Sequence, residues 1–87
     1  MDEKIKEILT EKLNESLNEN EDIAELIFCI ENVDSDLLHM GIVIGRLYNS
    51  FVYQHRRILK RDPSNIEFRE FIGFIKSNKK LFSESNI

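Results

Sequence analysis

Few side chains in this sequence have the spacing that metal or acid–base chemistry requires. Asp36 and His39 are three residues apart, which places a carboxylate and an imidazole on one face of a helix. Carboxylate-x-x-His pairs ligate metals in helical bundles, but such centres need the pair twice, with further glutamates pointing inward. The sequence has no second copy of the pair. We therefore predict no metal and no cofactor.

Cys29 and His55 are two further reactive side chains, and their positions predict structural roles. A single cysteine cannot form an internal disulfide, and we expect Cys29 to be a small buried hydrophobe; a reactive or metal-bound thiol is the alternative. His55 falls within an apolar stripe of its helix, which predicts a hydrogen-bonded core histidine. Burial disfavours a charged imidazole, so a buried His55 could make stability depend on pH.

The sequence carries no catalytic signature. It contains no G-x-S-x-G motif, no glycine-rich phosphate loop and no cysteine–histidine arrangement with supporting spacing. The acidic residues concentrate in residues 1–36, where helical periodicity places most of them on solvated faces. We therefore expect a protein that is not an enzyme and has no small-molecule substrate.

Basic and aromatic side chains in the second half of the longest predicted helix form the candidate binding surface. Forked guanidinium donors, fixed positive charge and an aromatic ring suit phosphates, carboxylates or exposed bases. Three lysines of the last helix, Lys76, Lys79 and Lys80, would extend the surface if that helix packs antiparallel to the central one. The predicted anion- or partner-binding residues are Arg46, Tyr53, Arg56, Arg57, Lys60 and Arg61.

The charge distribution leaves two interpretations of this basic surface open. The net charge is −4, but residues 1–36 carry 3 basic and 12 acidic residues, whereas residues 37–61 carry 5 basic and no acidic residues. A local basic face can bind an anion even in an acidic protein. Alternatively, the acidic residues 1–36 lie against the basic segment and neutralise it.

Residues 35–61 are predicted to form one long helix around which the other segments pack. Asp34 and the two residues after it offer acceptors and negative charge for its first turn. Asp62-Pro63 ends it, because the residue before a proline is disfavoured in helical geometry.

The first half of this helix is apolar on nearly all sides. Gly41 and Gly45 form G-x-x-x-G, which lets another backbone approach closely. We expect ordinary tight packing within the fold there, with a dimer seam as the alternative. Ile42 and Val43 fall away from the main apolar stripe, which comprises Leu37, Gly41, Ile44, Tyr48, Phe51, Val52, Ile58 and Leu59.

Two helices are predicted before the central one. Within residues 2–18, apolar side chains recur at spacings of three and four, which predicts an amphipathic helix. A row of glutamates lies on the opposite side of this helix. We expect the row to be solvated; alternatively, it faces a basic partner. Asn20 is a suitable N-cap for a second helix that ends near Val33 and leaves Phe28 off its stripe. The expected core residues are Ile5, Ile8, Leu9, Leu13, Leu17, Ile23, Leu26, Ile27, Ile30 and Val33.

A last helix is predicted from about Asn65 to Leu81 or Phe82. Ser64 and Glu67 match the reciprocal S-x-x-E capping box, which is the clearest local signal in the sequence. Phe74 and Leu81 lie to one side of the expected buried stripe, which comprises Phe68, Phe71, Ile72, Ile75 and Phe82.

These elements predict an all-α fold, a compact bundle of about four helices around the central helix. We expect one helical domain over residues 1–82 and a flexible tail at residues 83–87. Alternatively, residues 1–18 form an N-terminal arm that docks on the rest of the domain. The first residues lack the charged and apolar regions of a signal peptide, which predicts a cytoplasmic protein. The apolar stretch in residues 37–45 is too short to cross a bilayer, so no membrane partner is expected.

The off-stripe apolar side chains suggest that a second chain completes the surface, since contiguous exposed apolar surface usually marks an interface. We predict a non-catalytic protein-interaction or regulatory module, a homodimer or the partner of another protein. The alternative is a nucleic-acid-binding accessory protein that uses the basic surface. The predicted interface residues are Phe28, Ile42, Val43, Phe74 and Leu81.

Overall fold

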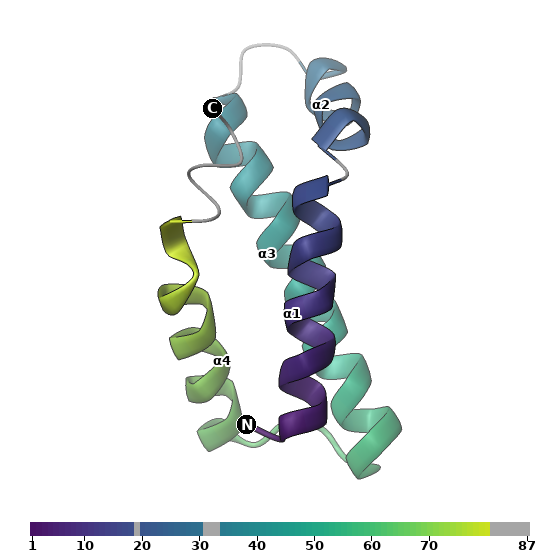
Figure 1. Ribbon diagram of the computed structural model, residues 1–87, viewed down its shortest axis with the longest axis vertical. Coiled ribbons are helices and arrows are strands. Elements are labelled where there is room, and N and C mark those ends of the chain that lie inside the picture. The colour runs from purple at the N-terminus through teal and green to yellow at the C-terminus, as the bar shows by residue number, and fades with distance from the viewer. Residues whose placement is uncertain (19, 31–33, 81–87) are drawn as a thin grey trace.

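The computed structural model describes residues 1–18, 20–30 and 34–80, and every regular element in these ranges is helical. The 20 residues of α3 continue directly into a π-helix of 5 residues, η1, so that together they form the predicted central helix. The all-α fold is therefore confirmed (Figure 1). The elements are α1 (Glu3–Asn18), α2 (Asn20–Phe28), α3 (Ser35–Gln54), η1 (His55–Leu59) and α4 (Asn65–Ser77).

The three longer helices run up, down and up along an elongated molecule of 40 × 22 × 21 Å. α3 is antiparallel to both α1 and α4, and α2 lies at the end of the molecule where α1 finishes and α3 starts (Figure 1). The N-terminus lies beside the first half of α4, where the amino group of Met1 pairs with the carboxylate of Glu70.

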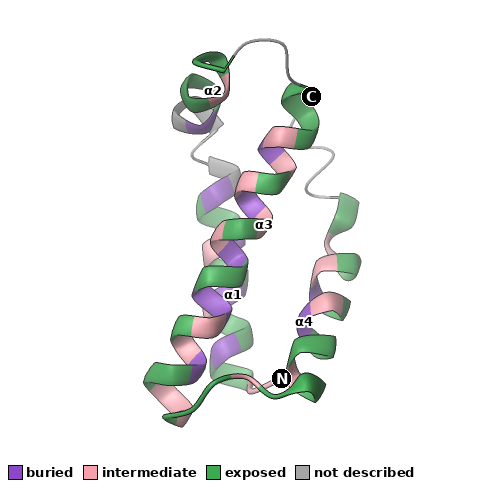
Figure 2. Ribbon diagram, turned by 180° about the vertical axis from the view of Figure 1, so that it is seen from behind, coloured by how far each residue is buried: buried purple, intermediate pink, exposed green. Residues whose placement is uncertain are grey.

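The hydrophobic core lies mainly between α1 and α3. Ile5, Leu9 and Leu13 follow one another at four-residue spacing along α1 and are at most 2% exposed, and Val43 and Leu47 of α3 are fully buried. Burial of one such side chain contributes about 1.5–3 kcal/mol relative to leaving it exposed. Buried positions recur along both helices (Figure 2). The core comprises Ile5, Leu9, Leu13, Ile23, Val43, Leu47, Phe51, Phe71 and Phe74.

The buried side of α3 differs from the stripe that the sequence pattern predicts. Leu37 is 65% exposed and Tyr48 is 45% exposed, so their predicted burial is wrong. α1 instead covers the side of α3 that carries His39 and Ser50. Because these two residues are polar, the pattern of apolar residues in the sequence does not identify that side as buried. The buried residues of α3 are His39, Val43, Leu47, Ser50 and Phe51.

The central helix begins and ends near the predicted signals. Asp34 is its N-cap, as expected, and its Oδ1 accepts two first-turn N–H groups at 3.0 and 3.1 Å, which otherwise have no partner within the helix. At the other end Lys60 adopts a left-handed conformation with φ of 59°, which commonly closes a helix. The helix therefore ends at Leu59, two residues before the predicted Arg61.

The predicted capping box at the start of α4 is confirmed. The Ser64 N–H donates to Oε1 of Glu67 at 2.9 Å, and the Glu67 N–H donates to Oγ of Ser64 at 3.2 Å. Two amides that lack helical partners are thereby satisfied. This local motif fixes the start of α4, which runs back along α3 (Figure 1).

Aromatic rings join α4 to the second half of α3. Phe71 stacks on Phe51 with ring centroids 4.6 Å apart and planes 28° apart, and the edge of Tyr48 meets Phe71 at 6.0 Å. Such pairs contribute about 0.5–1.5 kcal/mol beyond the burial of their area. Phe51 and Phe71 are therefore the main connection between the two helices.

The buried face of α4 is rotated from the predicted one. Phe74, which the pattern places aside, is only 9% exposed, whereas Phe68 is 38% exposed. Phe74 lines a hollow with Met1 at the start of the chain, so α4 packs toward the beginning of α1 as well as toward α3. Leu81 and Phe82 lie outside the described residues.

Candidate functional site

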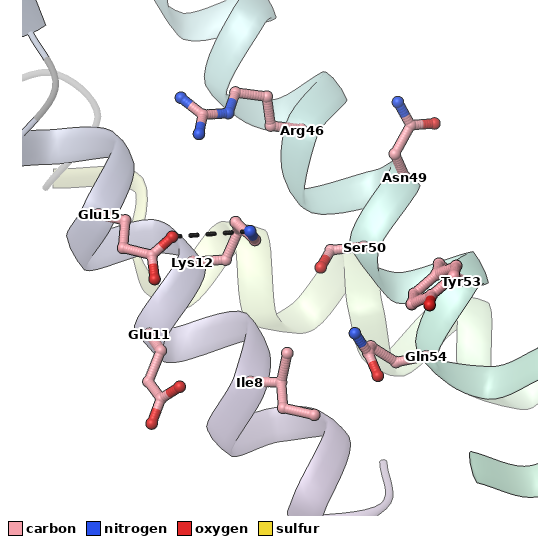
Figure 3. A pocket seen from close by; sticks show the side chains of 9 residues that line it. All are labelled: Ile8, Glu11, Lys12, Glu15, Arg46, Asn49, Ser50, Tyr53 and Gln54. Carbon is pink, nitrogen blue, oxygen red and sulfur yellow. Dashed lines mark ion pairs between the residues drawn. The ribbon is translucent and has the colours of Figure 1, made fainter. Parts of the chain in front are cut away.

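The six predicted anion-binding residues occupy two regions of the structure. Arg46 and Tyr53 line a groove between α1 and α3 (Figure 3), and Arg57 follows one turn beyond Tyr53. Arg56 and Arg61 contact carboxylates in and after the turn that leads to α4. The remaining residue, Lys60, is exposed at the end of η1.

The groove between α1 and α3 contains both signs of charge. Glu11 and Glu15 of α1 line it together with Arg46 (Figure 3). Lys12 lies 3.6 Å from Glu15 on the same helix. Acidic residues of segment 1–36 thus line the same groove as Arg46 and Tyr53, and the ion pair that Glu15 forms is with Lys12 of its own helix.

Arg56 and Arg57 already donate to neighbouring side chains. Nε of Arg56 donates to Oδ1 of Asp62 at 2.5 Å, and Nε of Arg57 donates to Oε1 of Gln54 at 2.8 Å. Both members of the Arg56–Asp62 pair are more than half exposed, and such surface pairs contribute about 0–1 kcal/mol. A ligand anion would therefore compete with Asp62 for Arg56.

Glu67 is the centre of a denser network. Nη1 and Nη2 of Arg61 donate to its two carboxylate oxygens at 2.6 and 3.0 Å. The pKa of Glu67 is lowered far below the ordinary 4.5, mainly by this bidentate contact and to a smaller extent by the hydrogen bond from the Ser64 N–H. The contact with Glu67 also raises the pKa of Arg61. The guanidinium fork that could recognise a phosphate is thus occupied by a carboxylate of the same chain.

Two basic side chains are therefore neutralised from an unexpected direction. The sequence pattern suggested that acidic residues within residues 1–36 neutralise the basic segment. The carboxylates that pair with Arg56 and Arg61 instead belong to Asp62 and Glu67, which follow the central helix. Antiparallel packing also places Lys76 beside Ile44, in the first half of α3, and so away from Arg56. The three lysines of the last helix consequently do not extend the surface around Arg56 and Arg61.

The predicted interface residues are also separated by the fold. Phe28, at the end of α2, is 89% exposed. Ile42 is partly buried against the core, and Val43 and Phe74 belong to the core itself. Leu81 lies outside the described residues. Within the described chain, Phe28 is the member of this set that presents most of its side chain to solvent.

An apolar groove between α3 and α4 was not predicted from the sequence. It has a volume of about 510 Å³ and is shallow. Tyr48 and Phe68 form an aromatic rim, with their rings edge to face at 6.4 Å, and both rings are more than one-third exposed. The lining residues are Ile44, Tyr48, Phe68, Phe71, Ile72, Ile75 and Lys76.

The glycines of the G-x-x-x-G motif leave the adjoining surface of α3 open. A Cβ atom added at Gly41 or Gly45 would meet nothing within 4 Å, so the expected tight packing within the fold is wrong for the described structure. One turn before Gly41, Leu37 is largely exposed. The described chain thus leaves uncovered the part of the apolar stripe around Leu37 and Gly41.

The two histidines are buried. His55 is 0% exposed and its Nδ1 lies 2.8 Å from the carbonyl oxygen of Phe51, which confirms the predicted core histidine. Its Nε2 lies 3.3 Å from Oε2 of Glu67, without hydrogen-bond alignment. Burial lowers the pKa of His39, and the nearby charge of Asp36 opposes part of that effect.

Cys29 does not occupy the predicted buried position. The thiol is exposed, and its Sγ donates to the carbonyl oxygen of Leu26 at 2.8 Å. Among the described residues, no three His, Cys, Asp or Glu side chains gather where they could hold a metal ion.

None of the helices in the described ranges combines the length and apolar character needed to cross a membrane. Comparisons with protein-family models, with curated proteins and with solved structures find no match for this chain.

Proposed function

We propose that this chain is a non-catalytic protein-interaction module that self-associates through the apolar groove between α3 and α4. The observation that carries the proposal is the exposed aromatic rim of Tyr48 and Phe68 above the groove of about 510 Å³. Aromatic side chains that are partly exposed around an apolar depression are typical of association surfaces.

The composition of the groove favours a protein over a small ligand. Lys76 is the one charged side chain among the groove-lining residues. Small-molecule sites usually enclose their ligand and present several polar groups that fix its orientation. A shallow apolar trough between two helices instead suits the apolar face of a helix from another chain.

Nucleic-acid binding through the basic residues receives less support. Arg56 and Arg61 hold Asp62 and Glu67, and Arg46 shares its groove with two glutamates. Phosphate contacts would make affinity fall steeply with salt, whereas apolar association does not. Titration with mixed DNA and RNA at low salt therefore separates the two functions.

Sedimentation equilibrium of the wild-type chain and of Phe68→Ser tests the proposal. We expect the wild-type mass to rise above 10.3 kDa with concentration, equally at low and high salt. Phe68→Ser removes one rim ring and should raise the dissociation constant about tenfold or more. A wild-type mass that stays at 10.3 kDa up to high micromolar concentration contradicts the proposal.

A further inference from the structure

The start of α3 carries an apolar strip that the described residues leave open. Leu37 is 65% exposed, and a Cβ atom added at Gly41 would meet nothing within 4 Å. These two positions share a helix face with Ile44 and Tyr48, since the four follow one another at spacings of four, three and four. Because Ile44 and Tyr48 line the groove, the strip continues the groove toward the start of α3. We refer to Leu37 and Gly41 as the α3 strip.

The groove fixes the register of α4 against α3. The edge of Tyr48 meets Phe71, and Ile44 and Ile75 line the same groove. Four residues back along α3 therefore correspond to four residues forward along α4, as expected for antiparallel helices with the same rise per residue.

The residue that continues this register opposite Leu37 is Phe82. It lies seven positions beyond Ile75, as Leu37 lies seven positions before Ile44, and seven residues are about two helical turns, which return to the same face. The described chain ends at Lys80, and two further residues span at most about 7 Å. The covalent chain therefore holds Phe82 close to this end of α4.

Chain connectivity and charge favour this segment over a second copy as the occupant of the strip. A segment of the same chain reaches the strip at an effective concentration in the millimolar range, far above that of a dilute partner. The described chain ends with exposed Lys79 and Lys80. The antiparallel course of α4 brings them toward the start of α3, which carries Asp34 and Asp36 (Figure 1). Opposite charges around an apolar contact favour this orientation.

We propose that Leu81 and Phe82 dock on the α3 strip of their own chain. The ring of Phe82 lies against the backbone at Gly41 and beside Leu37, because a helix without a Cβ at that position lets a large group approach closely. This contact closes the groove at one end and leaves its aromatic rim open to a second copy. The docking does not depend on the self-association proposed above, whereas its effect on the surface offered to a second copy does.

Disulfide trapping within one chain tests the docking. In a Cys29→Ser background, Leu37→Cys and Phe82→Cys are combined and oxidised mildly at a concentration where the chain is monomeric. The matched control uses Ser35→Cys in place of Leu37→Cys. Ser35 is exposed at the same end of α3 but lies two residues away, on the other side of the helix. We expect the intramolecular disulfide to form about tenfold faster in the Leu37 pair, because proximity governs the exchange.

The products of oxidation identify the occupant. A cross-linked species of monomer mass, formed at a rate independent of protein concentration, supports docking within the chain. A cross-link found only in covalent dimers shows that a second copy covers the strip. Equal rates in both pairs show that the segment does not dock there. Either of the last two results overturns the inference.

Tryptophan fluorescence gives a second measurement that keeps a ring at the docking position. The sequence contains no tryptophan, so Phe82→Trp introduces a single reporter, whose emission moves to shorter wavelength in an apolar environment. Adding Leu37→Ser should shift the emission to longer wavelength. Ile66→Ser is the matched control, since Ile66 is 76% exposed at the start of α4 and should leave the emission unchanged. An emission maximum that Leu37→Ser does not move overturns the docking.

The outcomes separate this inference from the proposed function. Both measurements are made on the monomeric chain, so a protein that never associates contradicts the proposed function alone. A protein that associates, but whose Phe82→Trp emission does not respond to Leu37→Ser, overturns the docking alone.

Discussion

The rings of Phe51 and Phe71 stack with centroids 4.6 Å apart, and this contact joins the last turn of α3 to the middle of α4. Both side chains are at most 4% exposed. The stack holds α4 beside α3 while leaving Tyr48 and Phe68 at the edge, so the same contact that completes the core also creates the apolar groove.

Phe71→Ala should lower the free energy of unfolding by about 3–5 kcal/mol, because it removes a buried ring and leaves a cavity. Ile66→Ala is the matched control on the same helix, since Ile66 is 76% exposed, and its effect should stay within about 0.5 kcal/mol. Urea denaturation of both variants measures the difference. Equal effects would show that the stack does not anchor α4.

The network around Glu67 predicts a dependence of stability on acid pH. The pKa of Glu67 is lowered in the folded chain from the ordinary 4.5, so its stabilisation is fully present above pH 4.5 and is lost as the pH falls below that value. Glu67→Gln keeps a side-chain oxygen that can accept from the Ser64 N–H, but it loses the negative charge that Arg61 binds. The urea midpoint of Glu67→Gln should therefore change less between pH 6 and pH 3 than that of wild type; parallel pH profiles would contradict this role.

His39 predicts a second pH dependence, nearer neutrality. Burial lowers the pKa of His39 in the folded chain below 6.5. Below pH 6.5 the unfolded chain therefore binds a proton at His39 more readily than the folded chain does. The contribution of His39 to folding stability is thus fully present above pH 6.5 and is lost as the pH falls below that value. The charge of Asp36 opposes the lowering, and Asp36→Asn should therefore steepen the loss of stability between pH 7 and pH 5. Thermal denaturation across this range measures the slope, and a shallower slope in the variant would count against the assignment.

Gly45→Ala should stabilise the monomer by about 0.5–1 kcal/mol, since alanine is the better helix residue and its Cβ meets nothing within 4 Å. Gly73→Ala, equally unobstructed on α4, is the comparison. The measurement is urea denaturation at a concentration where the chain is monomeric. Destabilisation by Gly45→Ala alone would show that another part of the chain approaches α3 closely there.

The helices and their first turns could be predicted because the signals are local. Asp34 caps α3, and Ser64 and Glu67 cap α4, through bonds that span at most three residues. The side of α3 that is covered could not be predicted in the same way. It depends on where α1 docks, and the buried His39 and Ser50 make that side look less apolar than the side that carries Leu37 and Tyr48.

The sequence predicts which residue types form the candidate site, but not how they are paired. Arg56 and Arg61 were recognisable as guanidinium groups on one helix, but their pairing with Asp62 and Glu67 depends on the left-handed Lys60 and on the turn that follows it. The groove was hidden for a similar reason, since Phe68 was expected inside and Phe74 outside. Phe68 and Phe74 are six residues apart, about 120° around the helix, so the direction in which α4 faces the core decides which of the two is buried.

Amide chemical shifts of the labelled chain, followed by NMR through a dilution series, test self-association through the groove most directly. The account predicts concentration-dependent shifts at Ile44, Tyr48, Phe68, Ile72 and Ile75 and constant shifts along the outer face of α1. Spectra that do not change with concentration, or changes confined to the outer face of α1, would contradict it.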